Sequence, residues 1–131
     1  MSTLKLDTIA SRDGTESTDV TNVINGSAKA WVNFTGTGTV TRNAWFNVTS
    51  VTDNNTGDYS VNFETAFSSA DDYVACVTAS CQNGTNAIPT VHQFGVTTAS
   101  TGGLFRFRIS EGNSYATYRD SDNIYFIVFG D

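Results

Sequence analysis

The strongest fold signal lies in residues 53–63, which read DNNTGDYSVNF. The first six residues combine Asn, Asp and Gly, the residue types that tight turns require. Tyr59, Val61 and Phe63 then alternate with polar residues, and this period of two is that of a half-buried β-strand. The stretch therefore predicts a β-hairpin, the unit from which an antiparallel sheet is built.

The same alternation recurs along the chain from residue 29 onward. Four more stretches place apolar residues on one side, with Trp31 opposite in the first and Arg106 and Arg108 opposite in the last. These predicted inward sets are Ala30, Val32 and Phe34; Ala44, Phe46 and Val48; Tyr73, Ala75 and Val77; and Phe105, Phe107 and Ile109. Residues 91–97 predict a weaker strand. Residues 124–129 are apolar on both sides, as in a strand that is central or covered by another subunit.

Turn-forming sequences separate these strands. Residues 35–41 are rich in Thr and Gly, and residues 82–86 read QNGTN. About seven short strands with turns between them predict an all-β fold, an antiparallel sandwich or jelly-roll-like domain over residues 29–131. The order of the strands within the sheets does not follow from the pattern.

Residues 1–28 differ from the rest and predict an extended N-terminal arm. Residues 4–7 alternate like a short strand, and residues 11–19 contain almost no apolar side chains. A helical spacing of apolar residues follows from residue 20, but one helical turn is marginal in water without a partner surface. We interpret the segment as a docking arm that orders against neighbouring chains, with a frayed terminus as the alternative. Its docking residues are Leu4, Leu6, Ile9, Val20, Val23 and Ile24.

The composition argues against several classes of function. The chain has 131 residues, about one domain by length, and its net charge of −6 gives no electrostatic footprint for nucleic acid. No apolar run approaches the roughly 20 residues that span a bilayer. The N-terminus lacks the layout of a secretory signal. We expect a protein made in the cytoplasm, with no nucleic-acid partner and no membrane insertion.

Groups for catalysis or metal binding are sparse. His92 is the only histidine, and a lone histidine in a weak strand is more often structural than catalytic. Residues 120–123, DSDN, resemble a calcium loop only faintly, because the Gly and the distal Glu of an EF-hand loop are missing. No carboxylate pair stands out for glycoside hydrolysis. We expect no enzyme activity, no bound metal and no cofactor.

The two cysteines, Cys76 and Cys81, lie close together in the sequence. On one extended strand their side chains would point to opposite faces about 16 Å apart, beyond disulfide reach. A turn between them would bring the sulfur atoms together, although a reducing cytoplasm gives little reason for a bridge. Two free thiols are the favoured interpretation, with a disulfide as the alternative.

Aromatic residues are frequent, with nine Phe, five Tyr and two Trp. Each can bury on the order of 150–250 Å², so together they exceed what the core of such a domain needs. Trp31 and Trp45 stand opposite the predicted inward sets and are candidates for a subunit interface. The alternative is that both faces of their strands are covered within one chain.

A candidate receptor loop lies near the C-terminus. Residues 111–119 read EGNSYATYR and mix Tyr, Asn, Ser and Arg, as adaptable binding loops do. The candidate contact residues are Asn113, Tyr115, Tyr118 and Arg119. An ordinary polar hairpin explains the composition equally well.

Three stretches carry a resemblance to a known family. Residues 3–9 read TLKLDTI, residues 22–34 read NVINGSAKAWVNF with GTGTV after Thr35, and residues 46–54 read FNVTSVTDN with TGDYSVNF closing at residue 63. In this order they resemble a module of tail-fibre-like virion proteins of marine and freshwater bacteriophages, of the cyanophage type. The resemblance covers about half of the chain, residues 1–63.

The resemblance implies a homotrimer located in the virion. Its N-terminal region would attach to other virion proteins, its C-terminal β domain would face the host or solvent, and there are no catalytic residues to carry over. The implied function is that of a tail fibre or fibre tip that contributes to binding a host surface glycan or protein. The alternative is a capsid or tail decoration protein without a receptor role. A polysaccharide-degrading tailspike ranks behind both.

Overall fold

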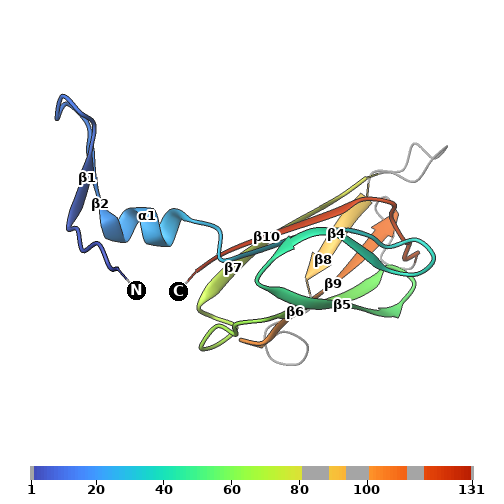
Figure 1. Cartoon of the computed structure of the whole chain (residues 1–131). Coiled ribbons are helices and arrows are strands. Elements are labelled where there is room, and N and C mark those ends of the chain that lie inside the picture. Colours follow the sequence, from blue (N-terminus) through green and yellow to red (C-terminus); the bar gives the residue numbers. More distant parts are fainter. Residues whose placement is uncertain (1, 81–88, 94–100, 112–116, 131) are drawn as a thin grey trace.

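A two-layer antiparallel β-sandwich forms the body of the molecule, and a short arm precedes it (Figure 1). The computed structural model describes residues 2–80, 89–93, 101–111 and 117–130. The predicted all-β sandwich is confirmed. Its strands are β3 (Ala30–Thr35), β4 (Thr41–Phe46), β5 (Val48–Asn55), β6 (Asp58–Phe63), β7 (Tyr73–Ala79), β8 (Pro89–Gln93), β9 (Leu104–Glu111) and β10 (Ile124–Gly130). The arm contains β1 (Thr8–Ala10), β2 (Ser17–Asp19) and the helix α1 (Val20–Gly26).

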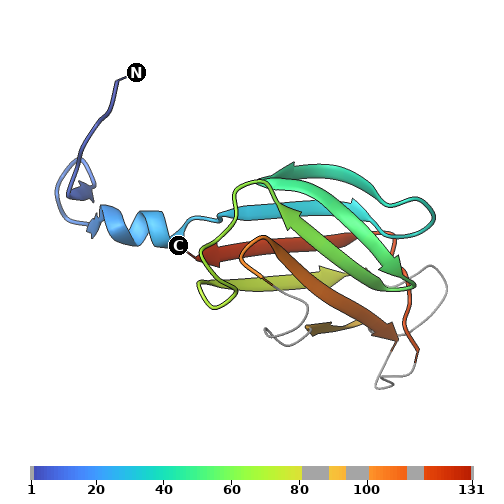
Figure 2. The same ribbon diagram turned by 90° about the horizontal axis from the view of Figure 1, so that it is seen from below.

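The first sheet has the strand order β4-β3-β10-β7, and the second has the order β5-β6-β9-β8. The turned view in Figure 2 shows β3 and β10 lying side by side, with α1 leading into the start of β3. Phe126 of β10 lies opposite Val32 of β3 on one side and Val77 of β7 on the other. β10 is therefore central, which confirms one of the two interpretations of residues 124–129.

Aromatic side chains fill the space between the sheets. The ring centroid of Phe107 lies 5.9 Å from that of Tyr59 and 6.2 Å from that of Phe105. Seven of the sixteen aromatic residues of the chain are therefore buried core residues, whereas Trp31, Trp45, Phe46 and Tyr125 are exposed. The buried apolar residues are Ala30, Val32, Phe34, Val48, Tyr59, Val61, Phe63, Phe67, Phe105, Phe107, Ile109, Ile124, Phe126 and Val128.

The edge strand β4 departs from the predicted pattern. Ala44 and Phe46 are exposed, and only Val48 of that predicted inward set is buried. Asn47, between β4 and β5, has a φ of 52°, a left-handed conformation that Asn tolerates better than most residues. Its side-chain amide donates to the carbonyl oxygen of Lys29 at 3.0 Å. The chain crosses from the first sheet to the second at this residue, so the period of two does not continue across it.

The hairpin predicted at residues 53–63 is present as β5 and β6. Asp53 lies opposite Tyr59 in the register. Gly57 in the turn has a φ of 65°, which glycine adopts without steric cost. A Cβ atom at this position would lie 2.7 Å from the carbonyl oxygens of Ile109 and Arg119. The turn is therefore packed against the end of β9 and the backbone at residue 119.

The arm leads away from one end of the sandwich (Figure 1). Its strand is Thr8–Ala10, which pairs with β2, so the strand predicted at residues 4–7 is wrong. The predicted helical segment is confirmed as α1, although its N-cap residue Asp19 makes no side-chain capping bond. None of residues 2–28 is buried. The arm therefore adds no buried side chain to the core.

Replacing Gly57 by Ala should destabilise the domain more than the same change at Gly38. Both glycines have a left-handed φ, 65° and 66°, so each alanine costs about 1–2 kcal/mol for the backbone conformation. A Cβ at Gly38 meets no atom within 4 Å, whereas one at Gly57 meets backbone atoms. In urea unfolding, we expect Gly57→Ala to lose at least about 2 kcal/mol more than Gly38→Ala. Equal losses would contradict the close packing of this turn.

Candidate functional site

The outer face of the second sheet carries a group of polar side chains centred on Asp58. This Asp58 cluster consists of Asp58, Arg106, Arg108, Asn54 and Tyr118. Asp58 begins β6 and lies opposite Arg108 of β9. Arg106 donates from Nε and Nη2 to both carboxylate oxygens at 2.8 Å, and Arg108 donates from Nε at 2.8 Å. Asn54 Nδ2 donates to Asp58 Oδ1 at 3.2 Å, so the carboxylate accepts four hydrogen bonds.

The two arginines are more accessible than the carboxylate that they share. The Asp58 side chain is 2% exposed, whereas those of Arg106 and Arg108 are 32% and 31% exposed. Burial by itself would raise the pKa of the Asp58 carboxyl, but hydrogen bonds and charges from both arginines outweigh it and hold the pKa below 3.8. Hydrogen bonds to Asp58 raise the pKa of both guanidinium groups. Within the cluster, two guanidinium groups therefore face one ionised carboxylate.

Asp58 is not among the residues that the sequence pattern singled out, because it stands within the turn-forming run DNNTGD. The sequence feature that could have indicated a buried carboxylate was the pair Arg106 and Arg108 on the outer side of one strand, since partly buried guanidinium groups need an acceptor. Only the register between β6 and β9 shows that this acceptor is Asp58.

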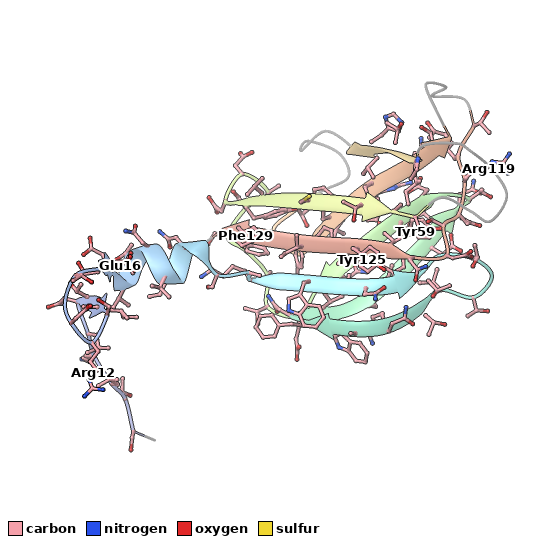
Figure 3. The ribbon with its side chains drawn as sticks, turned by 90° about the horizontal axis from the view of Figure 1, so that it is seen from above. Arg12, Glu16, Tyr59, Arg119, Tyr125 and Phe129 are labelled. Atoms are coloured by element: carbon pink, nitrogen blue, oxygen red, sulfur yellow. The ribbon has the colours of Figure 1, made fainter. Side chains whose placement is uncertain are left out.

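Tyr118, a member of the predicted receptor loop, belongs to this cluster, and Arg119 of the same loop follows it in the chain. The guanidinium carbon of Arg108 lies 4.8 Å from the ring centroid of Tyr118, and Arg108 Nη1 donates to the Tyr118 hydroxyl at 3.4 Å. Arg119 lies at the end of the sandwich opposite to the arm (Figure 3). Asn113 and Tyr115 lie outside the described residues. The structure thus brings part of the predicted loop to a charged site.

A shallow hollow of about 410 Å³ opens beside Arg108. The turn between β5 and β6 forms one wall, and residues 117–118 form the other. The backbone N–H of Gly57 donates to Asp120 Oδ1 at 2.7 Å, and the N–H of Arg119 donates to the carbonyl oxygen of Ile109 at 3.0 Å. These bonds hold both walls in place. The lining side chains that the structure describes all carry a polar group: Asn55, Thr56, Asp58, Arg108, Thr117 and Tyr118.

The outer face of the first sheet is uncharged and largely apolar. The alternation that buries Val32 and Phe126 turns their neighbours outward, and Figure 3 shows Tyr125 and Phe129 along β10. A shallow hollow of about 340 Å³ lies over β3, β10 and β7. Contiguous exposed apolar surface of this kind marks interaction sites. We call it the apolar face, made by Trp31, Phe46, Val74, Cys76, Tyr125, Ile127 and Phe129 with the neutral residues Asn33, Ala44 and Thr78.

The two tryptophans of the predicted subunit interface belong to different sides of the sheet. Trp31 lies opposite Phe46 and is part of the apolar face. Trp45 lies opposite Val32, whose side chain is in the core, so the Trp45 side chain starts from the inner side of the edge strand. It is nevertheless 48% exposed, with the Arg42 guanidinium carbon 4.3 Å from its ring. The prediction that both tryptophans lie on the side of their strand away from the core is wrong for Trp45. Its neighbours Ala44 and Phe46 are the exposed residues of β4, because the chain leaves this edge strand for the second sheet at Asn47.

The predicted docking residues of the arm leave much of their apolar surface in solvent. The arm is braced by polar contacts of its own, since the Ser11 and Thr15 hydroxyls each donate to Asp13 Oδ1 at 2.7 Å. These hydrogen bonds lower the pKa of Asp13 to about 2. The exposed fractions lie between 44% and 81% for Leu4, Leu6, Ile9, Val23 and Ile24, and Val20 is half-buried.

The other candidate groups for chemistry have structural partners. His92 Nε2 lies 2.6 Å from the Ser110 hydroxyl. Asp120 accepts a hydrogen bond from the Tyr59 hydroxyl at 2.7 Å, and burial together with this bond raises the pKa of Tyr59. Asp122 accepts one from the loop between β3 and β4. In the part of the chain that the structure describes, no group of three or more His, Cys, Asp or Glu side chains could hold a metal ion.

Cys76 is an exposed free thiol on β7. The other cysteine of the chain, Cys81, lies outside the described residues. The prediction of two free thiols therefore stays a prediction for the pair.

No protein-family model, no curated protein and no solved structure matches the chain. Among the described residues, no helix has the length and the apolar character that crossing a membrane requires. The function therefore has to be inferred from the arm, the apolar face and the Asp58 cluster.

Replacing Asp58 by Asn should destabilise the protein at neutral pH and remove part of its acid sensitivity. The change leaves two partly buried guanidinium groups without their carboxylate, which costs about 2–3 kcal/mol. Because folding lowers the pKa of Asp58, its stabilisation is present above the ordinary value of 3.8 and is lost as the pH falls through the lower folded value.

Urea unfolding of the wild type and Asp58→Asn should therefore give stabilities that converge below the ordinary aspartate pKa. Asp13→Asn is the control, because Asp13 also has a lowered pKa but lies in the exposed arm. A difference between the wild type and Asp58→Asn that stays constant into acid would contradict the proposed role of the ion pairs.

Proposed function

We propose that the chain is a structural protein of a bacteriophage particle, a tail fibre or fibre tip that contributes to host attachment. The resemblance of residues 1–63 to tail-fibre-like virion proteins supports this proposal. The observation that carries it is the uncharged apolar face, because such a surface suits a protein that works within an assembly. The alternative is a capsid or tail decoration protein, which would use the same face without binding a receptor.

The proposed occupant of the apolar face is another copy of the chain, in a homotrimer. The ten residues of the face include no Asp, Glu, Lys or Arg, so covering them requires no desolvation of charge. Complete burial of a large apolar side chain contributes roughly 1.5–3 kcal/mol, and Trp31, Phe46 and Tyr125 are all exposed. Closed symmetry presents the same face on every copy, so each such contribution is repeated in the assembly.

The two ends of the molecule differ in the way that a fibre subunit requires. Arg12 and Glu16 of the arm lie at one end in Figure 3, and Arg119 lies at the other. In the proposed function the arm binds other virion proteins through its exposed apolar side chains. The hollow beside Arg108 then faces away from the attachment point, toward the host or the solvent.

The proposed role includes no enzyme activity. A glycoside hydrolase needs two carboxyl groups about 5–9.5 Å apart, one of which transfers a proton. Asp58 is a poor acid or base at neutral pH, because its carboxylate accepts four hydrogen bonds and its pKa is lowered. We therefore assign the Asp58 cluster to binding and not to hydrolysis.

If the apolar face joins the subunits, Tyr125→Glu should convert a homotrimer into monomers. The substitution places a charge on the exposed centre of the face, where burial would then cost desolvation. Thr49→Glu is the matched control, because Thr49 is an exposed residue of β5 in the opposite sheet. Sedimentation velocity at micromolar concentration measures both. A monomeric wild type, or a trimeric Tyr125→Glu variant, would refute the proposed interface.

Antibodies against the chain should label the tails of phage particles that carry its gene, as seen by immunogold electron microscopy. Labelling confined to the capsid would support the decoration alternative. Intact particles with no label, and no peptides of the chain by mass spectrometry, would overturn the proposal that this is a virion protein.

Deleting residues 1–28 should abolish incorporation into the particle but leave a folded homotrimer. The described part of this segment contributes no buried residue, so its loss leaves the core intact. Circular dichroism and sedimentation check fold and assembly, and the same immunogold assay checks incorporation. Asp13→Asn, which changes the arm without removing its apolar side chains, is the control. Normal incorporation of the truncated protein would contradict the role of the arm.

A further inference from the structure

The hollow beside Arg108 combines a cationic group with neutral polar groups. We propose that it binds an acidic saccharide, a sugar unit that carries a carboxylate. The inference rests on the proposed role in host attachment and deepens it, because it names the chemical class of the receptor.

The chemistry of the Asp58 cluster supports an anionic ligand. Among the described residues that line the hollow, the acidic one is Asp58, and its carboxylate is buried and shared between Arg106 and Arg108. The side chain of Arg108 remains about a third exposed at the wall of the hollow. A planar guanidinium group matches the geometry of a carboxylate better than any other side chain does. A ligand carboxylate at this wall can therefore contact the guanidinium group of Arg108.

The neutral lining supports a sugar and not a small anion alone. Asn55, Thr56 and Thr117 are exposed and present amide and hydroxyl groups, and Tyr118 adds a ring and a phenolic oxygen. Such groups can exchange hydrogen bonds with sugar hydroxyls. The volume of about 410 Å³ lies within the range of small-molecule sites. A single carboxylate ion would leave most of this space to water.

The site is organised before a ligand arrives. Arg108 is fixed by its bond to Asp58, which the bidentate contact with Arg106 and the amide of Asn54 hold in turn. The turn is anchored at Gly57, whose N–H donates to Asp120 Oδ1 at 2.7 Å and whose carbonyl oxygen accepts from the N–H of Ile109 at 2.8 Å. Groups that are held in place lose little conformational entropy on binding.

Arg42 offers a control for Arg108. It is a partly buried arginine of β4 in the first sheet, where its guanidinium group packs against Trp45 and donates to the carbonyl oxygen of Val48 at 2.6 Å. It belongs neither to the lining of the hollow nor to the Asp58 cluster. If the loss of any arginine charge lowers the affinity, Arg42→Gln and Arg108→Gln should behave alike. If Arg108 binds a ligand, only Arg108→Gln should weaken binding.

The test is a titration of the full-length protein with glucuronate, glucose and acetate, followed by amide chemical shifts in NMR. We expect glucuronate to shift the amides of Thr56, Gly57 and Tyr118 in a saturable way, glucose to cause no shift, and acetate to bind more weakly. Arg108→Gln should weaken glucuronate binding at least about 10-fold, the effect of losing one charged hydrogen bond. Arg42→Gln should keep the affinity within about 3-fold of the wild type.

A second variant tests the hollow without changing an ion pair that the fold needs. Thr117→Ala removes an exposed hydroxyl at the wall and should weaken glucuronate binding without lowering stability. No shifts with glucuronate, equal losses in both arginine variants, or equal binding of acetate and glucuronate would each overturn the saccharide assignment. A uronic-acid polymer that binds more tightly than glucuronate would identify a surface polysaccharide as the source, and equal affinity would identify a free sugar. Particle labelling by antibody does not depend on this site, so the proposed function can stand if the saccharide assignment fails.

Discussion

The pairing of β10 with β3 and β7 holds the first sheet together, and the rest of the molecule depends on it. β10 joins the strand that follows the arm to the strand that begins the second half of the domain. Its inner residues Ile124, Phe126 and Val128 are buried, so this strand contributes apolar side chains to the core along its length. Because its outer residues are also apolar, the strand that completes the fold also creates the apolar face. In the proposed homotrimer, folding and assembly would use the two sides of the same seven residues.

The two outer faces of the sandwich are chemically opposite. The first sheet presents neutral and apolar side chains, whereas the second presents Ser, Thr, Asn, Arg and the buried Asp58. A surface of the first kind is stabilised by removal from water, and a surface of the second kind interacts with hydrophilic ligands in water. The same sandwich can therefore use one sheet for contacts between copies and leave the other open to solvent. This division requires no additional domain.

Much of the fold was predictable from the sequence, because the period of two in residues 30–34, 59–63 and 105–109 reports burial directly. The pattern failed at β4, where Asn47 adopts a left-handed conformation and redirects the chain. The site was harder to predict. Arg106 and Arg108 were visible as an outward pair, but Asp58 is brought to them by a strand register that no local pattern encodes.

The turn at residues 53–58 couples the fold to the candidate site. Gly57 allows close contact with the end of β9. The same turn supplies Asp58, the acceptor of the cluster, and Asn54, one of its donors. A substitution at these positions would alter the hairpin as well as the charge of the hollow. Thr56 and Thr117 are exposed at its walls. If the hollow binds the proposed saccharide, changes in ligand preference should therefore accumulate at these two threonines, while the turn glycine, Asp58 and the arginines that it holds stay fixed by the requirements of folding.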